Sequence, residues 1–258
     1  MKHFFGPLNP PRGDLKIILR KVLFKPPSGG FGGLRYISNK LFYPHIGGIE
    51  KVVYDISKIT KFDENINMHI LAANDNFKRK HILVNKSKVN KTPSLGIYHS
   101  MPITPFLPFD LNLYKNIDIF HYHLPFPLGV LSEFLNFNKG KIIVTWHSDI
   151  VKQEKILKIY KPLLMKFLKK VDIIITTSPQ MKNNSPFLNN FKEKCKVIPL
   201  GIDINRFKSD NVDFDFVKNL KSKYKKPILF FLGRLTYYKG LEYLLKAMQK
   251  IDAKLLIG

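Results

Sequence analysis

The sequence predicts an α/β fold in which a mostly parallel sheet is covered on both faces by helices. Two observations lead to this prediction. Short apolar runs rich in Ile, Val and aromatic residues are typical of buried strands, and amphipathic stretches of helix length lie between several of them. A succession of strand, helix and strand is typical of parallel sheets that are buried between two layers of helices.

The elements follow in order from Leu34. Seven apolar runs are expected to form strands, at residues 34–39, 68–74, 80–85, 117–123, 141–147, 171–178 and 195–201. Two segments repeat their apolar residues with a period of about 3.6 residues and are expected to form helices, at 48–61 and 151–168.

The pattern predicts three parts along the chain. Residues 1–33 contain five prolines and six glycines and are expected to form a basic extension outside the core. Residues 34–212 are expected to form a Rossmann-like domain, and residues 213–258 the beginning of a second one. The second part is predicted to contain helix 216–224, strand 227–234, helix 240–251 and strand 254–258. Since an apolar strand at the end of a chain cannot close a two-layer domain, we expect this second domain to be truncated.

The charge and the cysteine content limit which partners and which structural cross-links are expected. A net charge of +24 is typical of proteins with anionic partners, but most of the 43 basic residues are lysines, so biased composition remains an alternative to a functional basic surface. The single cysteine, Cys195, excludes an internal disulfide and a Cys-based zinc cluster.

No apolar run is long enough to span a bilayer, because Arg20 and Lys21 interrupt the run near the start of the chain. We expect a cytoplasmic protein that associates peripherally with an anionic membrane surface, on the inner face of the cytoplasmic membrane. Nucleic acid is not an expected partner, since no basic helix or strand with interleaved aromatic residues is present.

Two glycines, Gly47 and Gly48, lie between the first strand and the helix that contains Glu50. The N-terminus of a helix presents unpaired N–H groups and a positive dipole end, and glycine lets a phosphate approach the backbone closely. The residues leave two interpretations open: an anion-binding turn, or a tight turn in which Glu50 is a favourable charge in the first turn. The dinucleotide pattern G-x-G-x-x-G and the Walker lysine are absent.

Three histidines are predicted to lie at or near the carboxyl ends of strands. His147 follows an apolar strand and would face the crevice where open α/β sheets bind ligands, with Ser148 or Asp149 placed to cap the next helix. His121 and His123 share one face of a strand. Because no Cys and no H-E-x-x-H motif lies nearby, we expect no metal site and interpret the pair as lining the crevice or packing.

Two cations flank a later turn from strand to helix. Arg234 follows a strand, and Lys239 opens the next helix, so that both would lie near a helix N-terminus. Such an arrangement suits a diphosphate, with solvated surface charge as the alternative.

Five segments in order resemble the retaining glycosyltransferases of family 4, which have the GT-B architecture of two facing Rossmann-like domains. The segments are YPHIGGIEKVV, VTWHSD, TTSP, VIPLGID followed by RF, and GRLTYYKGLEYLLKAM. The resemblance covers residues 34–258. It implies transfer of a sugar from a nucleotide-diphosphate sugar to a saccharide or lipid-linked acceptor, with retention of configuration and without a metal or other cofactor. Assembly of polysaccharide or lipopolysaccharide is the usual setting of this family.

The resemblance also implies roles for single residues. Gly47 and Gly48 would meet the donor diphosphate, and His147 would contact the donor sugar as the catalytic residue. Arg234 and Lys239 would neutralise the leaving diphosphate, whose negative charge grows as the glycosidic bond breaks.

One departure from the family pattern affects the expected activity. Family members carry a pair of glutamates further into the second domain that holds the donor, and this chain ends before it. We therefore expect the chain as given to be weakly active or inactive. The alternative is a non-catalytic remnant that binds a saccharide or a protein partner.

Overall fold

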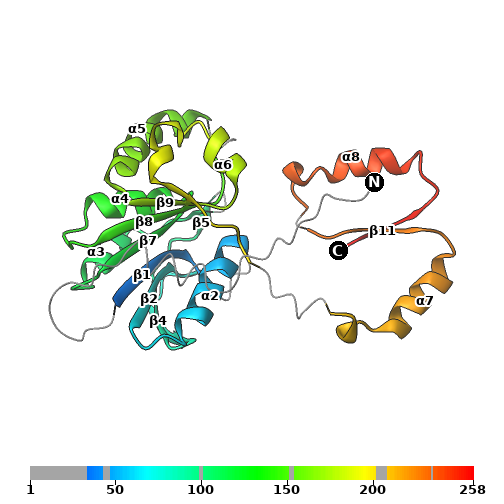
Figure 1. Cartoon of the computed structure of the whole chain (residues 1–258), viewed down its shortest axis with the longest axis horizontal. Helices are drawn as coiled ribbons and strands as arrows, with labels where there is room; N and C mark the ends of the chain where they lie inside the picture. Colours follow the sequence, from blue (N-terminus) through cyan, green and yellow to red (C-terminus); the bar gives the residue numbers. More distant parts are fainter. Residues whose placement is uncertain (1–33, 43–46, 99–100, 151–153, 202–207, 234) are drawn as a thin grey trace. The chain divides into compact units, whose positions relative to one another are not determined.

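The structure is a computed structural model. It describes residues 34–42, 47–98, 101–150, 154–201, 208–233 and 235–258. The chain divides into two compact units, residues 1–201 and 202–258, which are described separately (Figure 1). The domain boundary predicted from the sequence lies between residues 212 and 213. The predicted extension, residues 1–33, lies outside the described residues.

The first unit is built on an eight-stranded sheet. From edge to edge the strands are β10 (Cys195–Val197), β9 (Ile173–Thr176), β8 (Lys141–Trp146), β7 (Ile119–Leu124), β1 (Leu34–Leu41), β2 (Ile66–Ala73), β4 (Ser87–Thr92) and β3 (Lys80–Val84). Neighbouring strands are parallel except β3, which runs antiparallel to β4 at one edge. All seven runs predicted as strands are therefore confirmed in this sheet.

Helices cover the two faces of the sheet. One face packs against α2 (Gly48–Thr60), whose Val53 and Ile56 join a core cluster with Ile119 of β7. The helices of the other face are α3 (Leu107–Asn112), α4 (Pro127–Phe134) and α5 (Glu154–Lys170), and α6 (Pro179–Asn184) follows β9 (Figure 1). The predicted helices at 48–61 and 151–168 correspond to α2 and α5.

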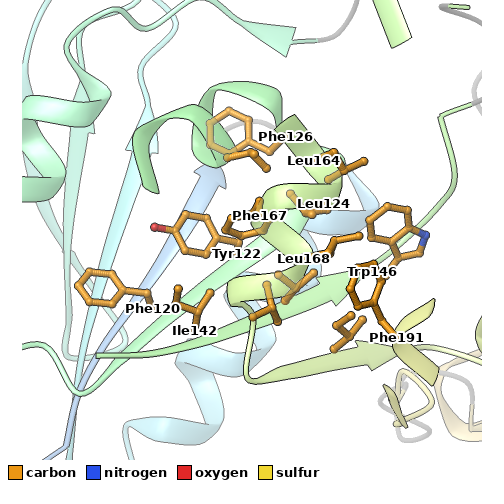
Figure 2. Close-up of a cluster of buried hydrophobic side chains, with 14 of the residues drawn as sticks. Phe120, Tyr122, Leu124, Phe126, Ile142, Trp146, Leu164, Phe167, Leu168 and Phe191 are labelled. Atoms are coloured by element: carbon orange, nitrogen blue, oxygen red, sulfur yellow. The ribbon is translucent and has the colours of Figure 1, made fainter. Parts of the chain in front are cut away.

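Alternation along the strands separates the two cores. Phe120, Tyr122 and Leu124 of β7 lie in the core on the face of α4 and α5 (Figure 2). The ring of Tyr122 meets the edge of Phe167 from α5 at a centroid distance of 5.4 Å. Burying an aromatic side chain of this kind stabilises a fold by about 1.5–3 kcal/mol, so this face fixes which way β7 is turned.

The sequence analysis did not predict β4. Its residues, Ser87–Thr92, are mostly polar, and Val89 is its one residue in the hydrophobic core cluster. Asn85 and Lys86 both have positive φ and form the two-residue turn between β3 and β4, a geometry that matches the twist of a hairpin. A second correction concerns β1, which continues through Leu41, whereas the predicted strand ended at residue 39.

The second unit contains the two helices and two strands predicted for it, together with two 3-10 turns that were not predicted. They are the 3-10 turn η3 (Ser209–Asn211), α7 (Phe214–Tyr224), β11 (Ile228–Phe231), the 3-10 turn η4 (Tyr237–Lys239), α8 (Leu241–Met248) and β12 (Lys254–Ile257). β11 and β12 are parallel neighbours joined through α8, as in a Rossmann-like half. Within the described residues of both units, no helix has the length and apolar character needed to cross a membrane.

The aromatic contact beneath β7 gives a test of this core. Phe167→Ala is expected to lower the free energy of unfolding by about 3–5 kcal/mol, because it leaves a cavity against Tyr122. Trp146 is the only tryptophan of the chain and is buried in the same cluster, so its fluorescence during urea unfolding reports the loss. The matched control is Phe137→Ala, since Phe137 is 86% exposed and its removal is expected to change stability by less than about 0.5 kcal/mol. Equal effects of the two substitutions would contradict the assignment of the core.

Candidate functional site

Three histidines form a cluster at the carboxyl ends of β7 and β8. The imidazole rings of His121 and His123 stack with their centroids 4.3 Å apart, which confirms that they share one face. Nδ1 of His123 lies 3.0 Å from Nε2 of His147, and the two rings are stacked at 5.3 Å. Nε2 of His121 lies 2.6 Å from Oγ1 of Thr145 on the neighbouring strand. We call His121, His123, Thr145 and His147 the histidine cluster.

Burial governs the protonation of this cluster. His121 and His123 are buried, whereas His147 is only partly buried. Removal from water, together with the smaller effect of the nearby His147, lowers the pKa of His121 to about 3. His121 is therefore neutral at physiological pH, and His147 is the histidine of the cluster that is partly exposed to solvent.

The face on which the cluster lies follows from strand alternation. Ile119 and Ile143 belong to the core under α2, and the residues two positions further along the same strands, His121 and Thr145, share that face. The strand face thus changes from apolar to polar as it approaches the carboxyl edge. His147, just beyond β8, continues this side.

The N-terminus of α2 lies at the same edge of the sheet. Gly47 is its N-cap and Gly48 its first residue, and the N-cap residue, being glycine, has no side chain that could cap the helix. The carboxylate of Glu50 folds back toward the start of the helix, so closely that a Cβ atom on Gly47 would clash with Oε2 of Glu50. A Cβ atom on Gly48 would meet open space. A negative charge at this position interacts favourably with the helix dipole. The geometry therefore places an anionic group of the protein itself where the backbone opens at Gly47.

Asp149 holds the segment that follows His147. Its Oδ1 accepts hydrogen bonds from Nε1 of Trp146 at 2.9 Å and from Oγ of Ser185 at 2.6 Å. The sequence analysis assigned Ser148 or Asp149 to the cap of the next helix, but residues 151–153 lie outside the described residues and α5 is described from Glu154. The bonds that the structure shows for Asp149 tie the loop to a buried ring, and Ser148 is exposed.

The two predicted cations belong to the second unit. Arg234 lies outside the described residues. Lys239 is exposed at the end of η4, and Gly240 follows it with a φ of 70° as the N-cap of α8. The left-handed backbone at Gly240 explains why glycine stands there, since other residues adopt it at a cost.

The sequence analysis missed the residues that support the site. Thr145 bonds His121, and Ser185 bonds Asp149, from positions 24 and 36 residues away in the chain. Thr145 precedes His147 by two positions, which is the signal of a shared strand face, but nothing in the sequence marks Ser185. Within the ranges that the structure describes, no group of three His, Cys, Asp or Glu side chains is placed to hold a metal ion.

A separate pocket lies away from the histidine cluster. It is lined by Leu71, Arg79, His81, Asn90, Lys91, Asp110, Leu113 and Tyr114. Its polar groups largely bond one another, with Arg79 paired to Asp110 at 2.7 Å and His81 bonded to Asn90 at 2.6 Å. None of the residues predicted for the site lines it.

Comparison with known proteins gives relatives over most of the chain. The family model described as Glycosyltransferase Family 4 matches residues 46–206. The D-rhamnosyltransferase WbpZ of Pseudomonas aeruginosa is 33% identical over 156 residues, which are 58% of this chain and 40% of that protein. The O-antigen chain mannosyltransferase C of Escherichia coli is 30% identical over 226 residues, 82% of this chain and 56% of that protein. The chain thus spans about half the length of these relatives.

Solved structures show the fold. A sucrose-phosphate synthase from Thermosynechococcus elongatus matches with a TM-score of 0.65 and 17% identity, over 86% of this chain and 62% of that chain. Alr3699/HepE of Anabaena in complex with UDP-glucose matches with a TM-score of 0.60 and 15% identity, over 86% of this chain and 60% of that chain. The predicted α/β fold of GT-B type is confirmed by these matches.

The two hydrogen bonds to Asp149 predict a cost for its removal. Asp149→Ala is expected to lower the free energy of unfolding by about 1–3 kcal/mol, because two buried or partly buried donors lose their acceptor. Urea unfolding followed by far-ultraviolet circular dichroism measures this. Asp149→Asn, which keeps an oxygen acceptor, and Ser148→Ala, which removes an exposed hydroxyl, serve as controls. If Asp149→Ala were as stable as Ser148→Ala, the anchoring role would be wrong.

The lowered pKa of His121 predicts how stability depends on pH. In the unfolded chain the imidazole of His121 has the ordinary pKa of 6.5, whereas in the folded chain its pKa is about 3. The contribution of His121 to stability is therefore complete above pH 6.5 and falls as the pH drops below that value. This one group contributes a slope of at most about 1.4 kcal/mol per pH unit. Urea unfolding between about pH 7 and about pH 4.5 is expected to show a shallower slope for His121→Gln than for the parent protein. Identical slopes would show that His121 is not held neutral by the fold.

Proposed function

Since the chain belongs to glycosyltransferase family 4, we propose that the protein transfers a sugar from a nucleotide-diphosphate sugar to a saccharide acceptor with retention of configuration at the anomeric carbon. The observation that carries this proposal is the histidine cluster, with the partly exposed His147 bonded to His123 at 3.0 Å on the edge of the sheet where α2 begins. An open α/β sheet binds its ligands at this edge.

His147 is proposed as the catalytic residue that contacts the donor sugar. Its Nε2 lies within hydrogen-bond distance of Nδ1 of His123, so a buried neighbour sets the orientation of the His147 ring. An imidazole fixed in this way offers its hydrogen-bonding edge to a sugar hydroxyl next to the reacting carbon without having to reorganise. His123 is proposed as a positioning residue, since it acts through His147.

The leaving diphosphate is proposed to bind at the start of α2. As the bond between the anomeric carbon and the diphosphate oxygen breaks, negative charge grows on the diphosphate, and the backbone N–H groups near Gly47 and Gly48 stabilise it. Glu50 lies at this position in the present structure, so its carboxylate has to turn away as the diphosphate enters. Arg234 and Lys239 are proposed to supply the remaining positive charge, in a reaction that needs no metal.

The relatives guide the proposed substrates. The names of two of them, a D-rhamnosyltransferase and an O-antigen chain mannosyltransferase, point to transfer of a hexose or deoxyhexose onto a growing saccharide chain. The complex of Alr3699/HepE with UDP-glucose supports a nucleoside diphosphate as the donor carrier. We therefore propose a nucleotide-diphosphate sugar as donor and a saccharide, free or lipid-linked, as acceptor.

Substitution of His147 tests the proposal. His147→Ala is expected to lower sugar transfer by about 100-fold or more, since a positioned group at the reacting centre contributes on this scale. Because the chain spans about half the length of its relatives, transfer is measured in a version of the protein of the relatives' full length, with a panel of nucleotide sugars and saccharide acceptors. Trp146 fluorescence shows that the variant remains folded. The control is His81→Ala, because His81 is exposed on the edge strand β3. Transfer at the parent rate by His147→Ala would refute the catalytic assignment.

A further inference from the structure

A group of exposed apolar side chains lies at the carboxyl edge of β2 and β4. It consists of Phe77 in the loop after β2, Leu95 and Ile103 beside the short hairpin of β5 (Ile97–Tyr98) and β6 (Met101–Pro102), and Phe106 and Phe109 at the start of α3. We call these five residues the apolar cap. Phe109 is 70% exposed, Leu95 65% and Phe77 59%, so these rings and chains project into solvent.

Contacts join the segments that carry Phe77, Leu95, Ile103 and Phe106, and Phe109 lies three positions after Phe106, on the same side of α3. The rings of Phe77 and Phe106 meet edge to face at 5.9 Å. The backbone N–H of Leu95 donates to the carbonyl of Ile103 at 2.9 Å, and the N–H of Ser94 donates to the carbonyl of Asn76 at 2.9 Å. Exposed apolar residues that are joined in this way form one surface rather than isolated side chains, and such surfaces mark interaction sites.

Prolines and hydrogen bonds restrict the backbone beneath the apolar cap on both sides of residues 99–100. Pro93, Pro102, Pro105 and Pro108 have fixed φ angles. The hydroxyl of Ser94 lies within hydrogen-bond distance of the carbonyls of Gly96 and Ile103, at 3.0 and 3.2 Å. These bonds hold Leu95 and Ile103 beside each other.

Cations follow directly after the first member of the apolar cap. Lys78, Arg79 and Lys80 succeed Phe77 in the chain and are exposed. Arg79 pairs with Asp110 at 2.7 Å, while among the described residues no ion pair neutralises Lys78 or Lys80. Apolar tips flanked by unpaired lysines match the chemistry of an anionic bilayer surface, where rings enter the headgroup region and ammonium groups meet lipid phosphates. The net charge of +24 adds long-range attraction to such a surface.

We propose that the apolar cap, with Lys78 and Lys80, docks the protein on an anionic lipid bilayer. The side chains of Phe77, Leu95 and Phe109 enter the headgroup region, and the two lysines contact lipid phosphates. The histidine cluster lies at the same carboxyl edge of the sheet, on β7 and β8, so docking would present this edge to the membrane. Bilayer binding is a separate property from sugar transfer, and it is measured without any sugar substrate.

Co-sedimentation with lipid vesicles tests the proposal. The parent protein is expected to bind vesicles that contain phosphatidylglycerol and phosphatidylcholine more tightly than vesicles of phosphatidylcholine alone. The double variant Phe77→Ser/Phe109→Ser is expected to lower the partition coefficient between vesicles and water by about tenfold or more. The reason is that the variant lacks two aromatic rings that would be buried in the lipid headgroup region. Lys78→Glu/Lys80→Glu is expected to lower binding to the anionic vesicles by about tenfold or more and to leave binding to neutral vesicles unchanged.

Matched controls lie at the opposite edge of the sheet. Phe62, which is 72% exposed, precedes β2, and the exposed Phe137 and Lys139 precede β8, so all three lie near the amino ends of strands. Phe62→Ser/Phe137→Ser and Lys139→Glu are expected to bind vesicles as the parent does. Trp146 fluorescence confirms that each variant is folded.

Three results would overturn the proposal. Failure of the parent protein to bind anionic vesicles would exclude a bilayer as the partner. Equal losses in the control variants would show that binding comes from general hydrophobicity or charge rather than from the apolar cap. Binding to soluble polyglutamate that depends on the same residues, without binding to vesicles, would assign the surface to an acidic protein instead.

Discussion

The register between β7 and β8 is the constraint on which the candidate site depends. It aligns His123 with Thr145 and brings His147 within hydrogen-bond distance of His123, although the two histidines are 24 residues apart in the chain. A slip of one residue would turn Tyr122 toward α2 and both buried histidines into the aromatic core. The packing of Phe120, Tyr122 and Leu124 on the other face therefore fixes the geometry of the site as much as the histidines do.

Burial of the cluster decides what kind of chemistry it supplies. Desolvation favours the uncharged imidazole, so His121 contributes a hydrogen-bonding group and no positive charge. The hydrogen bond to Thr145 and the stacking on His123 offset part of the cost of burying it. The positive charge needed for the proposed diphosphate therefore has to come from groups other than His121.

The long apolar strands and helices could be predicted because their periodicity is strong. Elements with a weak pattern could not: β4 carries mostly polar residues, and α3 and α4 are short and have proline in their first turn. Among the site residues, His121, His123 and His147 could be found from their positions at the ends of apolar runs. The hydrogen bonds of Asp149 with Trp146 and Ser185 could not be predicted, because Ser185 reaches Asp149 only through the packing of segments distant in the chain.

By itself, the sequence determined the class of fold, the two-unit organisation and the edge of the sheet where polar side chains collect. These follow from local alternation and from the rule that the carboxyl ends of parallel strands meet at one edge. Only the tertiary structure decided that His123 bonds His147, that Glu50 folds over Gly47, and that Phe77 joins Phe106 on one exposed surface. Each of these contacts depends on strand order, register or side-chain direction, which are set by packing between segments distant in the chain.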